Sequence, residues 1–269
     1  MKIVDRGGGT PVVVVPGIQG RWEWMAPAID ALAQRCRVIT FSLADEPSCQ
    51  GAFDEARGFW CYVEQVRAAL DAARVQRATI CGVSYGGLIA AAFAARYPER
   101  TASLVLVSPM PPSWTPDRRA RFYVRAPRLL TPVFLAASLR LYREIAAANG
   151  GAARGIPAAL HHLWRVGTHM FSPGRMARRV SLLARADVAA DLRRASQPTL
   201  VITGETALDR VVPVRRAREY LELWPQAHLE TLARTGHLGL ITRPEAFAHL
   251  VVSFADQAAH GVAMRRRVG

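Results

Sequence analysis

The chain has 269 residues, of which 51% are hydrophobic and 21% charged, and its formal net charge is +14. That length and apolar content suit one large α/β domain and argue against a disordered protein. The positive charge comes almost entirely from arginines, which are scattered along the chain, because Lys2 is the only lysine. No helix-turn-helix, zinc-finger or RNP pattern accompanies the charge, so we expect no nucleic-acid partner.

Cysteine spacing and the N-terminal residues bear on the compartment. The chain has four cysteines, Cys36, Cys49, Cys61 and Cys81. They form no C-x-x-C pair and no metal-ligand spacing, so we expect reduced thiols and no metal. The apolar run Val12–Val15 is too short for a signal-peptide core or a membrane span. We therefore expect a cytoplasmic protein without stable membrane insertion, as a monomer or homodimer.

Short β-branched runs alternate with alanine-rich helical patterns. The predicted strands are Val12–Val15, Val38–Phe41, Ala78–Gly82, Leu104–Val107, Leu200–Thr203 and His228–Leu232. Because these runs are continuously apolar, they predict strands buried on both faces, as in a parallel sheet. The predicted helices lie near Met25–Gln34, Phe59–Ala73, Gly86–Arg96, Val214–Leu223 and Pro244–Ala258. The alternation indicates a doubly wound α/β sheet.

The alternation stops after Val107. Residues 109–196 carry helical patterns interrupted by prolines and no comparable strand pattern. A structureless loop of that length is rare inside a compact domain, so this stretch predicts a helical insertion. We expect an α/β core of residues 1–108 and 197–269, with residues 109–196 forming a helical lid.

The segment from Gly82 to Gly86 has the pattern G-x-S-x-G, with an apolar run before it and a helical pattern after it. This context predicts that Ser84 occupies a sharp strand-to-helix turn with its hydroxyl exposed for reaction. The two glycines leave room where side chains would meet neighbouring backbone. A glycine-rich turn with a solvated serine is the alternative. Phosphate binding fits less well, since neither dinucleotide nor P-loop spacing is present.

With this elbow, the chain resembles the α/β-hydrolase superfamily, in particular the lid-bearing serine esterases and lipases with an S-x-G-G elbow. The resemblance covers nearly the whole sequence and implies an α/β-hydrolase fold with Ser84 as nucleophile and no cofactor. Only fifteen residues precede Pro16. The family's N-terminal hairpin needs more, so its strands should be shortened or missing, with Gly7–Gly9 as their turn.

The resemblance also implies the partners of Ser84. The family places a histidine after the last strand, and His237 in Thr235-Gly236-His237 has that position. The family's acid follows the penultimate strand, where the segment from Asp209 to Pro213 matches its D-x-I/V-V-P signature. Glu205 is the alternative acid, because the gap before Asp209 is longer than usual. Histidine would act as the base and the carboxylate would orient it.

An oxyanion needs hydrogen-bond donors that already point at it. By resemblance, these are the backbone N–H groups of Tyr85, directly after the nucleophile, and of Ile18, in the loop after the first central strand. The family more often has His-Gly where this chain has Pro16-Gly17. The expected donor is a backbone group, so the substitution leaves it in place.

The lid should determine the substrate. Possible pocket residues are Gln19, Trp22, Trp24, His161, Trp164 and Leu238. The lid also carries six prominent arginines, Arg118, Arg119, Arg121, Arg125, Arg178 and Arg179. Most should lie on a solvated face, and the alternative is recognition of a substrate carboxylate or phosphate.

These features together predict a serine hydrolase that cleaves a carboxylic ester or related small acyl substrate through a Ser-His-Asp triad and an acyl-enzyme. Thioesterase, carbon–carbon bond hydrolase and amidase remain alternatives on the same triad. A non-catalytic protein that binds small ligands with a hydrolase fold is the alternative from another class.

Overall fold

The computed structural model describes residues 1–129, 131–132 and 139–268, with side chains as far as residue 259. Its strands form one sheet in the order β1-β3-β2-β4-β5-β6-β7. The strands are β1 (Val4–Arg6), β2 (Pro11–Val15), β3 (Arg37–Thr40), β4 (Ala78–Val83), β5 (Thr101–Val107), β6 (Thr199–Thr203) and β7 (Ala227–Thr231). β1 runs antiparallel to β3 and the other pairs are parallel, which confirms the predicted mostly parallel sheet.

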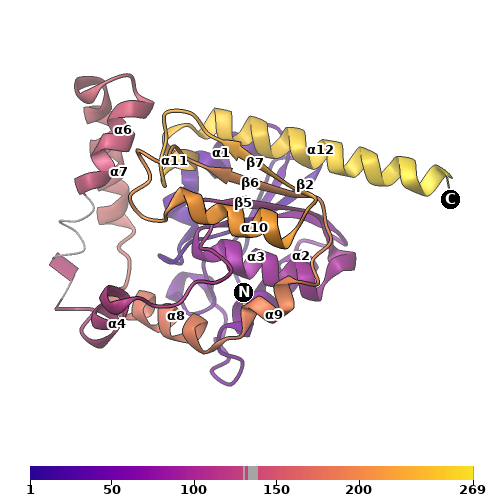
Figure 1. Ribbon diagram of the computed structural model, residues 1–269, viewed down its shortest axis with the longest axis horizontal. Coiled ribbons are helices and arrows are strands. Elements are labelled where there is room, and N and C mark those ends of the chain that lie inside the picture. The colour runs from indigo at the N-terminus through magenta and orange to yellow at the C-terminus, as the bar shows by residue number, and fades with distance from the viewer. Residues whose placement is uncertain (130, 133–138, 269) are drawn as a thin grey trace.

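Helices cover both faces of the sheet (Figure 1). One face packs against α1 (Ala26–Ala33), α11 (Gly239–Thr242) and α12 (Pro244–Val268). The other packs against α2 (Trp60–Ala72), α3 (Tyr85–Arg96), α9 (Val188–Leu192) and α10 (Arg218–Leu223). In β2, Val13 and Val15 join the second core and Val12 and Val14 the first. This two-sided burial is the physical reason for the continuous apolar runs.

The last strand departs from that expectation. Only Ala227 of β7 is buried, and the other four residues of the strand are exposed. The prediction of a strand buried on both faces is therefore wrong here. β7 pairs only with β6 and forms the edge of the sheet, so its outer residues face solvent.

The N-terminal strand is short, as expected. Gly7–Gly9 link β1 to β2, but β1 pairs with β3, with Asp5 opposite Ile39. The three glycines therefore connect strands that are not neighbours in the sheet. The sequence suggested a shortened N-terminal hairpin, and the structure has the single antiparallel edge strand β1 in its place.

Residues 109–196, here called the inter-strand segment, connect β5 to β6. They include α4 (Arg118–Arg125), α6 (Tyr142–Ala148), α7 (Ala152–Thr168), α8 (Pro173–Arg185) and α9. The α6–α7 pair packs beside α11 at one end of the molecule (Figure 1). Local signals set the helix starts: the side chains of Asp117 and Ser172 accept backbone N–H groups at the beginnings of α4 and α8. The division into core and lid stays a prediction at this point.

The strand order reverses between β2 and β4. After β2 the chain adds β3 on one side, and after β4 it adds β5 on the other. Loops that leave neighbouring parallel strands in opposite directions open a crevice at the carboxyl ends of those strands. Val15 pairs with Gly82, so the loop after β2 lies directly beside the turn at Ser84.

Candidate active site

Ser84 occupies the turn between β4 and α3 with φ 52° and ψ −113°, a conformation that is strained for a residue with a side chain. A Cβ on Gly82 would lie 2.3 Å from the Gly86 oxygen, and one on Gly86 would lie 2.4 Å from the Pro16 oxygen. Both positions therefore require glycine, as the pattern suggested. The Ser84 N–H donates to the Val107 oxygen at 2.9 Å, which ties the turn to β5.

The structure brings together the three side chains predicted as nucleophile, base and acid. Nε2 of His237 lies 3.2 Å from Oγ of Ser84. On the other side of the ring, Nδ1 lies 3.4 Å from Oδ2 of Asp209. The ring therefore bridges the hydroxyl and the carboxylate, although the carboxylate contact is long for a charge-assisted hydrogen bond.

Two loops hold this arrangement through direct backbone contact. A Cβ on Gly204 would lie 2.4 Å from the Gly236 oxygen, so the acid loop and the histidine loop touch without side chains between them. The Glu205 N–H donates to the Thr235 oxygen at 2.7 Å. Because the loops follow the paired strands β6 and β7, the sheet itself sets their spacing.

The structure distinguishes the two acid candidates by their contacts. Oδ1 of Asp209 accepts the N–H groups of Val211 and Val212 at 2.9 and 3.0 Å, which leaves Oδ2 toward His237. The Glu205 carboxylate instead accepts the Arg234 N–H at 2.7 Å. Burial acts to raise the pKa of Asp209, but His237 and the two backbone donors outweigh it and lower that pKa below its ordinary value.

The expected oxyanion donors adjoin Ser84. Tyr85 is the first residue of α3, so its N–H has no acceptor within the helix. Ile18 follows Gly17, and a Cβ on Gly17 would lie 3.6 Å from Cβ of Ser84. Among the described residues no hydrogen bond engages the Ile18 N–H. Both donors are thus available close to the nucleophilic position.

Arg179 of α8 holds the loop that contains Ile18. Its Nη1 donates to the Ile18 oxygen at 2.8 Å, and its Nη2 lies 2.7 Å from Asp45 and 2.6 Å from Glu46. The expectation of a solvated face fits the exposed Arg118, Arg119, Arg121 and Arg125 but is wrong for Arg179, which is fully buried. Two carboxylates compensate its charge, and that compensation makes its burial possible.

The charges of this cluster are closely balanced. Arg175 supplies a second cation, with Nε 3.3 Å from Oε2 of Glu46. Burial alone would lower the pKa of Arg179, but Asp45 and Glu46 raise it above its ordinary value. The sequence carried a weak signal for this role, because Arg179 shares a helical face with the buried Met176, Val180 and Leu183.

Glu144 of α6 is a second buried charge that contacts the site. Its Oε1 accepts the N–H of Leu238, the residue after His237, at 2.7 Å. Its Oε2 is buried and has no hydrogen-bond partner among the described residues. Burial raises the pKa of Glu144 to about 7, although His237 and the Gly236 and Leu238 N–H groups oppose the rise. A glutamate in a short alanine-rich helix gives no sequence signal for this contact.

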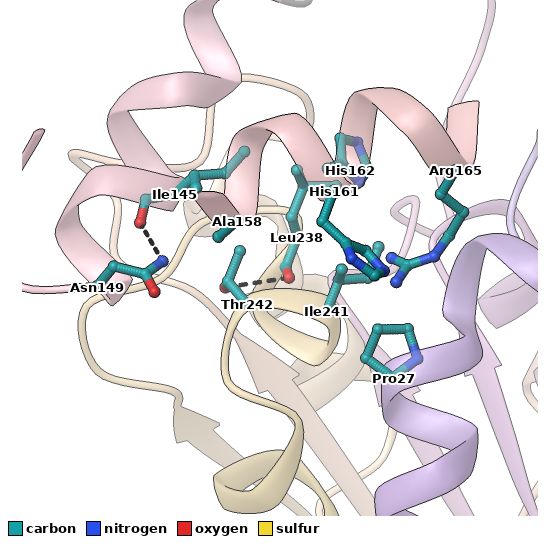
Figure 2. A pocket seen from close by; sticks show the side chains of 10 residues that line it. All are labelled: Pro27, Ile145, Asn149, Ala158, His161, His162, Arg165, Leu238, Ile241 and Thr242. Carbon is teal, nitrogen blue, oxygen red and sulfur yellow. Dashed lines mark hydrogen bonds between the residues drawn. The ribbon is translucent and has the colours of Figure 1, made fainter. Parts of the chain in front are cut away.

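A cavity of about 270 Å³ lies between the inter-strand segment and the core (Figure 2). Two of the predicted pocket residues, His161 and Leu238, line it. Trp164 is 62% exposed, and Trp24 donates its Nε1–H to the His169 oxygen. Trp22 packs against the core and Gln19 is half-buried in the Ile18 loop. The lining of this cavity includes neither Ser84 nor His237 nor Asp209. The assignment of the six predicted residues to a substrate pocket therefore stays a prediction.

Within the residues that the structure describes, no cluster of three or more histidine, cysteine, aspartate or glutamate side chains is placed to hold a metal ion. In the same part of the chain, no helix combines the length and apolarity needed to cross a membrane. The cytoplasmic location stays a prediction.

Comparison with known proteins identifies the family. A sequence profile of the alpha/beta hydrolase fold matches residues 10–244. A poly(3-hydroxyalkanoate) depolymerase of Ectopseudomonas oleovorans is 30% identical, over 96% of this chain and 88% of that protein. A 2-hydroxymuconate semialdehyde hydrolase of Pseudomonas putida is 29% identical, over 94% and 90%. An esterase structure from Exiguobacterium antarcticum has a TM-score of 0.76 at 19% identity, over 94% of each chain. The chain belongs to the α/β-hydrolase family and is a hydrolytic enzyme.

The first prediction concerns the elbow. We expect Gly86→Ala to lower the free energy of unfolding by about 1–3 kcal/mol or to prevent folding, because the new methyl group would overlap the Pro16 oxygen. Gly8→Ala is the matched control, since its Cβ would meet nothing within 4 Å. Urea unfolding of both variants measures the difference, and equal stabilities would contradict the close packing.

The second prediction concerns the buried arginine. We expect Arg179→Met to lower the free energy of unfolding by about 3–5 kcal/mol, because it leaves the buried Asp45 without this cation and Glu46 with Arg175 alone. Arg178→Met is the control: it breaks the pair with the exposed Glu55 and a cation–π contact with Phe53, and it should cost less than about 2 kcal/mol. Thermal unfolding of both variants measures the difference. A larger loss of stability in Arg178→Met than in Arg179→Met would contradict the prediction.

The third prediction concerns pH. Because folding raises the pKa of Glu144 from 4.5 to about 7, its contribution to stability falls as pH rises between those values. Glu144→Gln removes the ionisation, so it should stabilise the protein by up to about 3 kcal/mol at pH 8 and by little at pH 4.5. Urea unfolding at both pH values measures this. The exposed Glu222→Gln is the control, and a pH-independent effect of Glu144→Gln would rule the explanation out.

Proposed function

We propose that this hydrolase cleaves a carboxylic ester through an acyl-enzyme, with Ser84 as nucleophile, His237 as base and Asp209 as the acid that orients it. The observation that carries the proposal is the pair of contacts made by one imidazole: Nε2 to Ser84 Oγ at 3.2 Å and Nδ1 to Asp209 Oδ2 at 3.4 Å. A serine hydroxyl needs such a base to become an effective nucleophile near neutral pH. No cofactor enters the scheme.

The reaction proceeds in two halves. Ser84 Oγ attacks the carbonyl carbon while His237 takes its proton, and the carbonyl oxygen becomes an oxyanion held by the N–H groups of Ile18 and Tyr85. The intermediate then expels the alcohol, which receives the proton from His237. Water, deprotonated by His237, attacks the acyl-enzyme in the second half and releases the acid, which restores Ser84. The lowered pKa of Asp209 keeps it ionised beside the cationic histidine.

The inter-strand segment acts in this proposal as the cap over the core, with residues 109–196 as its extent. Two contacts support that role: Arg179 binds the loop of Ile18, and Glu144 binds the loop of His237. The cap thus reaches both the oxyanion side and the base side of the site. A change in its packing would move catalytic groups as well as the walls of a pocket.

A carbon–carbon bond hydrolase is the second candidate, favoured by the relative that is named 2-hydroxymuconate semialdehyde hydrolase at 29% identity. Thioesters and amides offer the same carbonyl to the same groups. All these reactions share the acyl-transfer machinery, so the substrate panel must distinguish the bond that is cleaved. The small acyl substrate and the monomeric or homodimeric state are part of the proposal.

The test is hydrolysis of nitrophenyl esters of increasing acyl length, with matched thioesters, anilides and a vinylogous 1,5-diketone. We expect esters to be turned over and Ser84→Ala to lower kcat by at least about 10³-fold. Asp209→Asn should lower it by about 10³- to 10⁴-fold by disturbing the histidine tautomer. Circular dichroism checks the fold. Full turnover by Ser84→Ala would exclude the mechanism, and preference for the diketone would favour the second candidate.

A further inference from the structure

The cavity under α7 contains one cation that the protein does not neutralise. Arg165 is 8% exposed, yet among the described residues its guanidinium makes no hydrogen bond and no ion pair. The charge of Asp30 acts on Arg165 from a distance. Asp30 is itself exposed, and its Oδ1 lies 2.8 Å from Nη1 of Arg6. Burial lowers the pKa of Arg165 and Asp30 only partly offsets that effect. None of its nitrogen atoms is among the fully buried polar atoms that lack a partner, so the five donors of this guanidinium are open to solvent and can meet a ligand.

The other polar side chains of the cavity do not supply the missing acceptor. Asn149 donates to the Ile145 oxygen and Thr242 donates to the Leu238 oxygen, as the dashed lines in Figure 2 show. His161, on the same face of α7, extends toward Arg165 in that view and adds a second group able to donate. No aspartate or glutamate belongs to the lining that the structure describes. The described lining thus holds one guanidinium and no carboxylate to pair with it.

We propose that this cavity binds the carboxylate of a small organic anion, with Arg165 as its charged partner. A planar carboxylate accepts two parallel hydrogen bonds from a guanidinium, and one full positive charge matches a monoanion better than a phosphate dianion. Apart from His162, the remaining lining residues, Ala158, Leu238 and Ile241 among them, are apolar and suit a short hydrocarbon body. The volume of about 270 Å³ limits the ligand to a small molecule.

The cavity shares a wall with the site. Leu238 lines it and directly follows His237, while Ile145 lines it and directly follows Glu144. A carboxylate there has two possible sources: the far end of the substrate, or a separate free acid. Binding itself does not depend on the proposed ester hydrolysis, whereas the substrate source does.

Binding is tested first on full-length Ser84→Ala, which cannot turn over the ligand. Isothermal titration with butyrate, hexanoate and their neutral amides should show carboxylate binding and no comparable amide binding. Adding Arg165→Met should weaken carboxylate binding at least about tenfold, as expected for loss of a charge-assisted pair. Arg154→Met, an exposed arginine on the same helix, should leave it unchanged. Equal binding by both arginine variants, or no carboxylate binding by the parent, would overturn the proposal.

Thermal stability gives a second readout. A purely structural role of Arg165 would change Tm in the opposite direction from the one we expect. Because Arg165 is unpaired, Arg165→Met should raise Tm in anion-free buffer and abolish the rise in Tm that hexanoate gives the parent. A fall in Tm in anion-free buffer would contradict the unpaired state. If Arg165→Met does not fold, Ala158→Leu narrows the cavity without touching a charge and should also weaken hexanoate binding.

Kinetics distinguish the two sources of the carboxylate. In the otherwise unchanged enzyme, a nitrophenyl hemiester and a neutral ester of equal length are compared. If the substrate supplies the carboxylate, Arg165→Met should lower kcat/KM at least about tenfold for the hemiester alone. If a free acid supplies it, hexanoate should alter turnover of the neutral ester in the enzyme and not in Arg165→Met. Should no ester be hydrolysed at all, the titration still decides whether the cavity binds carboxylates.

Discussion

Direct contact of backbone with backbone at the carboxyl ends of the parallel strands is the constraint on which the site depends. Gly86 lies against the Pro16 carbonyl, so the elbow and the loop of Ile18 have one permitted separation. Gly204 lies against Gly236, so the loops of Asp209 and His237 are fixed in the same way. Since these loops leave the paired strands β2 and β4, and β6 and β7, the hydrogen-bond register of the sheet sets the distances between the reacting groups. Chemistry that needs positions held to fractions of an ångström is thereby built on the most rigid part of the fold.

The inter-strand segment meets this rigid edge through three buried charged side chains whose pairing differs. Arg179 has two carboxylates and a carbonyl as partners, so it is a fixed support. Glu144 has a partner for one oxygen only, and its ionisation is held back to near-neutral pH. Arg165 has no partner among the described residues. The three side chains thus differ in how far the protein itself compensates their charge, and the carboxylate site we propose lies at the uncompensated end of this series.

The core and the proximity of Ser84, Asp209 and His237 could be predicted from sequence because each leaves a local signal. Two-sided burial makes the strands continuously apolar, and close packing makes Gly82 and Gly86 obligatory around Ser84. The contacts of Glu144 and Arg165 leave no such signal, since a charged residue in an alanine-rich helix looks the same whether it faces water or a loop over 90 residues away. Arg179 lies between these cases: its helical face was apolar, but only tertiary structure brings Asp45 and Glu46 to it. β7 did carry a signal, because its polar His228, Glu230 and Thr231 interrupt the apolar pattern and lie exposed at the edge of the sheet.

The lack of a protein partner for Arg165 among the described residues raises the question of why the fold keeps a charged side chain there. An apolar side chain at position 165 would remove the cost of a largely buried cation from a cavity whose lining includes the apolar Ala158, Leu238 and Ile241. A protein of marginal stability retains such a cost where the group does something that an apolar residue cannot. Here the cation lines a cavity to which Leu238, the residue after His237, also belongs, and its helix is part of the same segment that holds the loop of Ile18 through Arg179. In the proposed scheme, one helical segment thus contacts both the carboxylate cavity and the loops of the site, while the sheet sets the geometry around Ser84.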